Sequence, residues 1–178
     1  MPAAVAVKYF LRLSLPLYVI DQITKEIVVR NFAAPETGMM QPHPVIPGFF
    51  ELVRVHNTGI AFGRFNGGEY SNLIFGIIAA AALIGIAFFA RKGAFPTMLA
   101  KTSAALLVSG ILGNLTDRLA RGYVVDFLHF DLGFMIWPSF NVADACICIA
   151  AVLLFISGFQ KVEDPTPAPA DAGEKKPG

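Results

Sequence analysis

Two long uncharged stretches limit what this chain can fold into. Residues 70–90 contain no charged side chain, and residues 137–159 contain a single one, Asp144. A helix that crosses a bilayer needs about 20 mostly apolar residues, because each residue adds about 1.5 Å along an axis that must span about 30 Å. We therefore expect both stretches to be membrane-spanning helices. Gly76 and Gly85, in the first of them, are expected to allow close helix packing.

Two further stretches are weaker candidates for spans. Residues 95–119 carry Lys101 near one end and Asp117 and Arg118 near the other, and charges at such positions can lie at the membrane interfaces. Residues 5–28 hold several polar side chains around a central apolar run, which resembles the core of a signal peptide. No small-residue cleavage site follows this run, so we interpret it as a retained span.

The composition agrees with a membrane protein. Of the 178 residues, 55% are hydrophobic and 15% are charged, which is too apolar for one water-soluble core. Four spans place both termini on one side, where lysines and arginines cluster, so the positive-inside rule predicts that this side is cytoplasmic. We expect an all-α membrane protein with four transmembrane helices in a bacterial cytoplasmic membrane. The net charge of +1 gives no electrostatic reason to expect a nucleic-acid partner.

The long connections between the spans fall on the opposite, periplasmic side. Residues 31–69 are rich in Pro and Gly and include a β-like run at 49–55, which predicts a small extracytoplasmic cap containing β structure. Residues 120–136 are expected to form a second periplasmic loop. Residues 160–178 cannot bury apolar area, so we expect a disordered cytoplasmic tail after a single membrane domain at 1–159.

Polar side chains that a bilayer tolerates poorly gather at the outer ends of these spans. Asp144 is expected to lie roughly 10 Å inside the fourth span, where an unpaired charge costs roughly 3 kcal/mol. It therefore needs a partner, a proton or a wet cavity. Asn114 and Asp117 are three residues apart, as are Asn141 and Asp144, so each pair shares one helix face. The other members of this set are Asp21, Asn57, Arg118 and Asp126.

Two converging carboxylates suit hydrolysis by water. One carboxylate takes a proton from the water while the other, protonated, polarises the scissile carbonyl. Two like charges at close range do not both ionise easily, so their titrations are expected to be coupled. The histidines His43, His56 and His129 lack metal-ligand spacing, so we expect no metal and no cofactor.

Five motifs occur in order at the ends of the predicted spans. They are Asp21-Gln22-x-Thr24-Lys25, the run VHNTGIAFG at 55–63, GNLTDRL at 113–119, GYVVDF at 122–127 and FNVAD at 140–144. With these motifs the sequence resembles the lipoprotein signal peptidases, also called signal peptidase II. The resemblance extends over about residues 15–159.

The resemblance implies a fold, a reaction and a site. It implies an aspartic endopeptidase whose catalytic pair is Asp126 and Asp144. The substrate would be a prolipoprotein whose cysteine already carries diacylglyceryl, cleaved just before that cysteine, and the partners would be this precursor and membrane lipid, with the enzyme a monomer. Residues implied to support the site or position the substrate are Asp21, Asn57, Gly59, Asn114, Asp117, Arg118 and Asn141.

Simpler interpretations of the same residues stay open. Asp21 has Lys25 one helical turn away and would pair with it. Asp117 and Arg118 would be ordinary charges at a helix end, and residues 57–59 would be only a turn.

Two other classes of function also compete. A small proton-coupled transporter would use carboxylates embedded in the membrane, and a non-catalytic scaffold would use them to bind helices together. Transport needs polar groups distributed across the bilayer, whereas here they lie at the outer ends of the spans. A scaffold would tolerate replacement of the aspartates by asparagine, which an acid–base pair would not.

Overall fold

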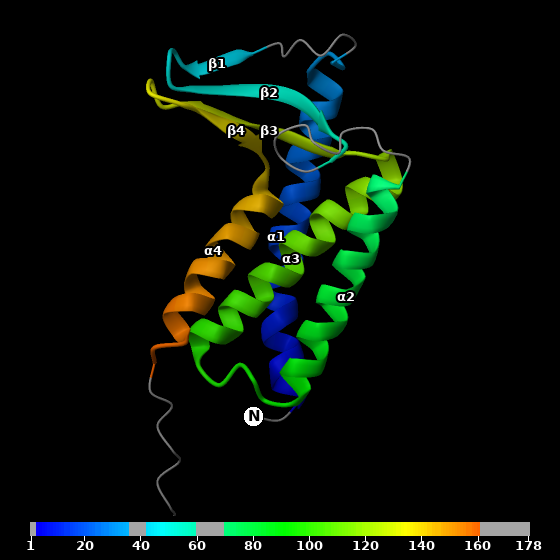
Figure 1. Ribbon diagram of the computed structural model, residues 1–178, viewed down its shortest axis with the longest axis vertical. Coiled ribbons are helices and arrows are strands. Elements are labelled where there is room, and N and C mark those ends of the chain that lie inside the picture. The colour runs from blue at the N-terminus through cyan, green and yellow to red at the C-terminus, as the bar shows by residue number, and fades with distance from the viewer. Residues whose placement is uncertain (1–2, 36–41, 60–69, 161–178) are drawn as a thin grey trace, which may run out of the picture.

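The computed structural model describes residues 3–35, 42–59 and 70–160. Within these ranges the chain forms a helical bundle with a small antiparallel sheet at one end, while the start of the first helix and the end of the last lie at the opposite end (Figure 1). The expected tail beyond residue 160 and the end of the cap at 60–69 lie outside the described residues. The elements in chain order are α1 (Ala3–Asn31), β1 (His43–Ile46), β2 (Phe50–Asn57), α2 (Ser71–Arg91), α3 (Met98–Arg121), β3 (Val124–Asp131), β4 (Ile136–Phe140) and α4 (Val142–Ser157).

Helix α3 lies in the centre of the bundle and packs against the three other helices. Its glycines make two of these contacts possible. A Cβ at Gly113 would lie 2.5 Å from Asp21 Oδ2 on α1, and a Cβ at Gly110 would collide with the backbone of α4 at Ala143. The expectation that Gly76 and Gly85 serve close packing is wrong, because a Cβ at either position would meet no atom within 4 Å.

The outer faces of the helices are apolar. Among the described residues, α2 and α3 are long and apolar enough to cross a membrane, and α4 is apolar but shorter, with 16 residues. Large apolar side chains face outward along α2 and are exposed within the part of the chain that the structure describes. The fold is that of a helical membrane protein, and the number of four spans stays a prediction. Outward-facing examples are Leu73, Ile77, Ile84, Phe88 and Phe89.

The sheet has the strand order β1-β2-β3-β4, and every neighbouring pair is antiparallel. Strands β1 and β2 belong to the predicted cap, β3 lies in the predicted second loop, and β4 covers the start of the predicted fourth span. The fold is mostly helical with a small antiparallel sheet, and its β structure extends beyond the cap in which it was expected. Asp126 lies opposite Val55 in the central pair, so it belongs to a strand and not to a loop.

The predicted fourth span is wrong at its start. Residues 136–140 form β4, and α4 begins only at Val142. A short apolar run fits a strand as well as a helix, and Pro138 is tolerated in this strand because β4 is at the edge of the sheet. Asn141 marks the true helix start, since its Oδ1 accepts the backbone N–H of Asp144 at 2.9 Å.

An apolar cluster joins the sheet to the bundle. Val28 on α1 packs with Val125 and Phe127 on β3, and all three side chains are buried. Successive side chains of a strand point to opposite faces, so Asp126, between the two apolar residues, points away from this cluster. The packing of α1 against β3 thereby sets the direction of the carboxylate.

Candidate active site

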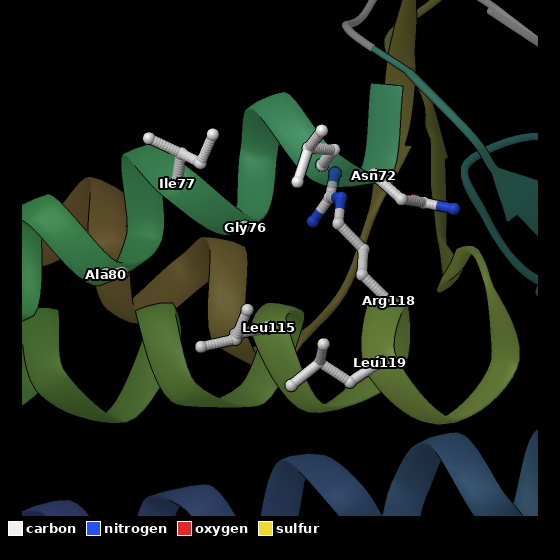
Figure 2. Close-up of a pocket in the computed structure, with 8 residues that line it drawn as sticks. Asn72, Gly76, Ile77, Ala80, Leu115, Arg118 and Leu119 are labelled. Carbon is white, nitrogen blue, oxygen red and sulfur yellow. The ribbon is translucent and has the colours of Figure 1, made fainter. Parts of the chain in front are cut away.

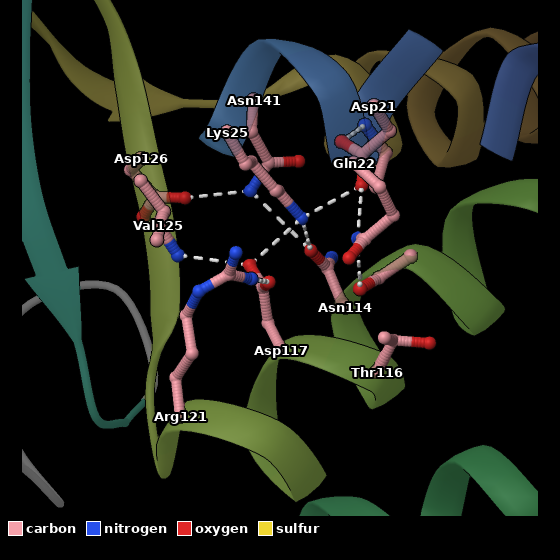
Figure 3. A network of polar contacts seen from close by, with 12 residues as sticks. Asp21, Gln22, Lys25, Asn114, Thr116, Asp117, Arg121, Val125, Asp126 and Asn141 are labelled. Atoms are coloured by element: carbon pink, nitrogen blue, oxygen red, sulfur yellow. Dashed lines mark hydrogen bonds and ion pairs between the residues drawn. The ribbon is translucent and has the colours of Figure 1, made fainter. Parts of the chain in front are cut away.

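The polar residues singled out from the sequence meet where α1, α3 and α4 reach the sheet (Figure 3). Asp126 is contributed by β3, Asn57 by the end of β2, and Asn141 and Asp144 by the start of α4. Residues far apart in the chain are thus brought together at one end of the bundle.

Asp126 is buried, with 2% of its surface exposed. Asn57 Nδ2 donates to its Oδ2 at 3.0 Å, and Asn141 Nδ2 donates to its Oδ1 at 2.7 Å. The pKa of Asp126 is raised to about 7, first by burial and then by the nearby Asp144 carboxylate, while the two amide donors and Lys25 act in the opposite direction. This carboxyl can therefore change its protonation state near neutral pH.

Asp144 lies in the first turn of α4 and not deep within a span, which corrects the expected depth of roughly 10 Å. A carboxylate at this position is favoured by the partial positive charge of the helix N-terminus. Its Oδ1 accepts a hydrogen bond of 2.7 Å from Asn114 Nδ2 on α3. Asp144 therefore has a hydrogen-bond partner, as was expected for a carboxylate in an apolar segment.

Two asparagines connect the aspartates. Asn141, which donates to Asp126, also donates from Nδ2 to Asn114 Oδ1 at 3.3 Å, and Asn114 in turn donates to Asp144. The result is a continuous hydrogen-bonded path from one carboxylate to the other. Neutral amides orient both carboxylates without adding charge between them.

Asn57 is held by a turn that includes Gly59. The backbone N–H of Gly59 donates to Asn57 Oδ1 at 3.1 Å, so the amide group of Asn57 must face Asp126. A turn at residues 57–59 and a role of Asn57 in the site are therefore compatible, because the turn directs the Asn57 amide group toward Asp126.

Asp21 and Asp117 contact Lys25, and within the described residues neither of them hydrogen-bonds to Asp126 or Asp144. Lys25 Nζ lies 2.9 Å from Asp21 Oδ2 and 3.1 Å from Asp117 Oδ2. The interpretation of Asp21 as the ion-pair partner of Lys25 is confirmed. Asp117 also forms an ion pair with Arg121. Arg121 forms a second ion pair with Glu26, in which Nη2 lies 2.8 Å from Oε2.

Lys25 was not among the site residues predicted from the sequence. Its side chain is fully buried, and it donates to Asn114 Oδ1 at 3.1 Å in addition to its two ion pairs. One signal was available: two aspartates within predicted spans need a cation, and Lys25 follows Asp21 by four residues, on the same helix face.

Arg118 lines two apolar grooves beside α2. Figure 2 shows the larger of the two. Its guanidinium sits over the Phe75 ring, 4.5 Å from the centroid, and its buried Nε lacks a hydrogen-bond partner within the described residues. The larger groove has a volume of about 480 Å³. The smaller one has a volume of about 230 Å³ and is lined by Asn114 and Ile147. This apolar groove therefore extends to Asn114, one of the two asparagines that connect the aspartates.

No group of three or more His, Cys, Asp or Glu side chains within the described ranges is arranged to hold a metal ion. The two cysteines of α4 are both free, Cys146 buried and Cys148 exposed. What the arrangement offers chemically is a pair of carboxylates, Asp126 buried and Asp144 partly exposed, whose hydrogen-bond donors are neutral amides. Such a pair is suited to acid–base activation of water.

The fold and this site define a helical membrane enzyme. Two solved structures described as bacterial membrane enzymes share the fold. One has a TM-score of 0.75 and 26% sequence identity, covering 93% of this chain and 96% of that chain. The other has a TM-score of 0.73 and 27% identity, covering 89% and 95%.

The sequence comparisons identify the family. The family model described as signal peptidase (SPase) II matches residues 13–160. A lipoprotein signal peptidase of Symbiobacterium thermophilum is 38% identical over 144 residues, which cover 81% of this chain and 90% of the relative. One of Burkholderia mallei is 36% identical over 154 residues, covering 86% and 89%. The chain belongs to the signal peptidase II family.

Proposed function

We propose that this chain is an aspartic endopeptidase that removes the signal peptide from diacylglyceryl-modified prolipoproteins, cutting just before the lipidated cysteine. The observation that carries the proposal is the pair of Asp126 and Asp144, joined by two asparagines in a member of the signal peptidase II family. The relatives' name, lipoprotein signal peptidase, supports the substrate class.

The reaction needs one proton shared by the two carboxyl groups. The ionised carboxylate takes a proton from water as the water oxygen bonds to the scissile carbonyl carbon, and the protonated carboxyl donates its hydrogen bond to the carbonyl oxygen. Collapse of the tetrahedral species breaks the C–N bond as the carboxyl that received the proton from water donates it to the leaving amine. This step restores the starting state of the pair, with one carboxylate ionised and the other protonated. The pKa of about 7 at Asp126 suits such an exchange near neutral pH.

The surroundings of the pair support a substrate held in the bilayer. The smaller groove, lined by apolar residues of α2, α3 and α4, runs up to Asn114 and Arg118. An apolar segment of a membrane-bound precursor would fill it, with its scissile bond near the aspartates. In this proposal the four helices span the cytoplasmic membrane, the sheet faces the periplasm, both termini are cytoplasmic, and one chain supplies the whole site.

Membership of this family does not favour the transporter or the scaffold. The proposal is tested by incubating the purified protein in detergent with a diacylglyceryl-modified prolipoprotein and following release of the signal peptide by gel shift. We expect the wild type to cut this precursor but not its unlipidated form. Asp126→Asn and Asp144→Asn are expected to remain folded and to lose activity.

A matched control lies on the same strand as Asp126. Asp131 is exposed at the end of β3, where it accepts the backbone N–H of Gly133, so Asp131→Asn makes the same chemical change away from the pair. It should retain wild-type activity. Near wild-type cleavage by either Asp126→Asn or Asp144→Asn would remove that residue from the pair, and a wild type that cuts nothing would overturn the proposal.

A further inference from the structure

A single buried ammonium group bridges two carboxylates from different helices. Lys25 Nζ on α1 lies 2.9 Å from Asp21 Oδ2, also on α1, and 3.1 Å from Asp117 Oδ2 on α3. Figure 3 shows these three side chains meeting between α1 and α3. All three are buried, with exposed fractions of 0–1%. Charges that are this thoroughly removed from water persist only when they are paired and hydrogen-bonded, so the three groups form one unit.

Each of the two carboxylates also holds a backbone N–H next to a member of the aspartate pair. Asp21 Oδ1 accepts from the N–H of Ala143 at 2.8 Å, and Asp117 Oδ2 accepts from the N–H of Val125 at 3.1 Å. Ala143 directly precedes Asp144, and Val125 directly precedes Asp126. The same ionic unit is therefore anchored one residue before both proposed catalytic groups.

The third contact of Lys25 determines which way an amide of the site faces. Lys25 Nζ donates to Asn114 Oδ1 at 3.1 Å. An ammonium group has donors and no acceptor, so the carbonyl oxygen of Asn114 must face it. The NH2 group of Asn114 is then left to donate to Asp144, as observed at 2.7 Å.

We propose that Lys25 is a positioning residue that sets the separation of Asp126 and Asp144 through Asp21 and Asp117, and the orientation of Asp144 through Asn114. The inference rests on the proposed function of the aspartate pair and adds to it a residue whose side chain is fully buried. Lys25 acts entirely through its three partners.

Removal of the ammonium group has a defined consequence. Lys25→Met removes the cation that lies between two buried carboxylates. Asp117 keeps its ion pair with Arg121, whereas Asp21 loses its ion pair with Lys25, and the repulsion between the two carboxylates shifts the backbone segments that they hold. A displacement of about 1 Å at reacting groups costs on the order of 100-fold in rate. We expect kcat to fall by about this factor while KM changes little, because Lys25 is not in contact with the substrate.

A charge-balanced triple variant separates positioning from simple loss of structure. In Lys25→Met with Asp21→Asn and Asp117→Asn, the asparagine oxygens can still accept the N–H groups of Ala143 and Val125, and no unpaired buried charge is left. We expect kcat to recover at least about 10-fold over Lys25→Met, following the same distance argument. Arg30→Met is the control on the same helix, because Arg30 is 75% exposed in its ion pair with Glu26.

The experiment measures kcat and KM for cleavage of the diacylglyceryl-modified prolipoprotein, with thermal unfolding in detergent as the test of folding. A low kcat in Lys25→Met, recovery in the triple variant and wild-type rates in Arg30→Met support the proposal. Wild-type kcat in Lys25→Met, or a triple variant no more active than Lys25→Met, overturns it even when the wild type cleaves. A wild type that cuts nothing overturns the proposed function, and this inference with it.

Discussion

Asn141 donates a hydrogen bond of 2.7 Å to Asp126 and at the same time caps the helix that carries Asp144. One amide group therefore does two things: its Nδ2 orients the carboxylate on β3, and its Oδ1 fixes where α4 begins. The start of the helix and the geometry of the pair depend on the same side chain. A substitution of Asn141 should therefore lower stability through the lost helix cap and activity through the lost contact with Asp126.

We predict that Asn141→Ala lowers stability by about 1 kcal/mol, the usual cost of a lost N-cap, and also abolishes most of the activity. Thr97→Ala is the matched control, because Thr97 caps α3 by accepting the N–H of Ala100 far from the aspartates. The two variants should show similar decreases in melting temperature, and only Asn141→Ala should lose cleavage. Equal activity in both would show that the contact with Asp126 is dispensable.

A second prediction concerns the pH dependence of stability. The pKa of Asp126 is raised from 3.8 to about 7, chiefly by burial. Between these two values the folded state holds a proton that the unfolded state has lost, so stability must fall as pH rises from about 4 to 7. Asp126→Asn removes this penalty, and we expect its unfolding free energy to exceed that of the wild type by a few kcal/mol at pH 8.

The difference should shrink toward pH 4, where the wild-type carboxyl is protonated in both states. Unfolding of both proteins in detergent at pH 4, 6 and 8 measures it. A gain in stability that is the same at every pH would mean that the carboxyl is not carrying the proton, whatever its effect on activity.

Most of the site could be predicted from the sequence because its polar residues are out of place in apolar helices. Asn114, Asn141 and Asp144 stand out in this way, and the family motifs add Asp126, which no helical pattern would select. The start of α4 was missed because residues 136–140 are mostly apolar and continue directly into the apolar helix. In so short a run, the spacing of apolar residues does not distinguish a strand from a helix.

The ionic unit around Lys25 was not predictable for a different reason. Lysines near helix ends usually extend to the membrane interface. The spacing from Asp21 predicts an ion pair on one helix face, but it does not show that Lys25 also meets a carboxylate of another helix. Its second carboxylate, Asp117, is more than 90 residues away in the sequence, so the bridge exists only once α1 and α3 are packed. The importance of Gly113 was not predictable for the same reason, because it depends on Asp21 of α1, which lies against Gly113 only once the two helices are packed.

A third prediction follows from that contact. A Cβ at Gly113 would lie 2.5 Å from Asp21 Oδ2 and 3.0 Å from the Ala143 side chain. Gly113→Ala should therefore displace the carboxylate, destabilise the protein by about 1–3 kcal/mol and reduce cleavage at least about 10-fold. Gly85→Ala is the control, because its new Cβ meets nothing within 4 Å. Loss of activity in both variants would trace the effect to helix flexibility instead of the contact with Asp21.

The last prediction concerns Arg118, whose guanidinium rests on Phe75 and whose buried Nε has no hydrogen-bond partner within the described part of the chain. A buried donor left unpaired costs about 1–3 kcal/mol, and a carbonyl oxygen of a substrate in the adjoining groove would satisfy it. Arg118→Lys keeps the charge but loses both Nε and the planar group that stacks on the ring. We expect KM for the lipidated precursor to rise about 10-fold or more, which corresponds to the lower end of that energy, while kcat changes less. Arg91→Lys, at the far end of α2, is the control and should leave both constants unchanged. A fall in kcat at constant KM would instead place Arg118 in the orientation of the aspartate pair.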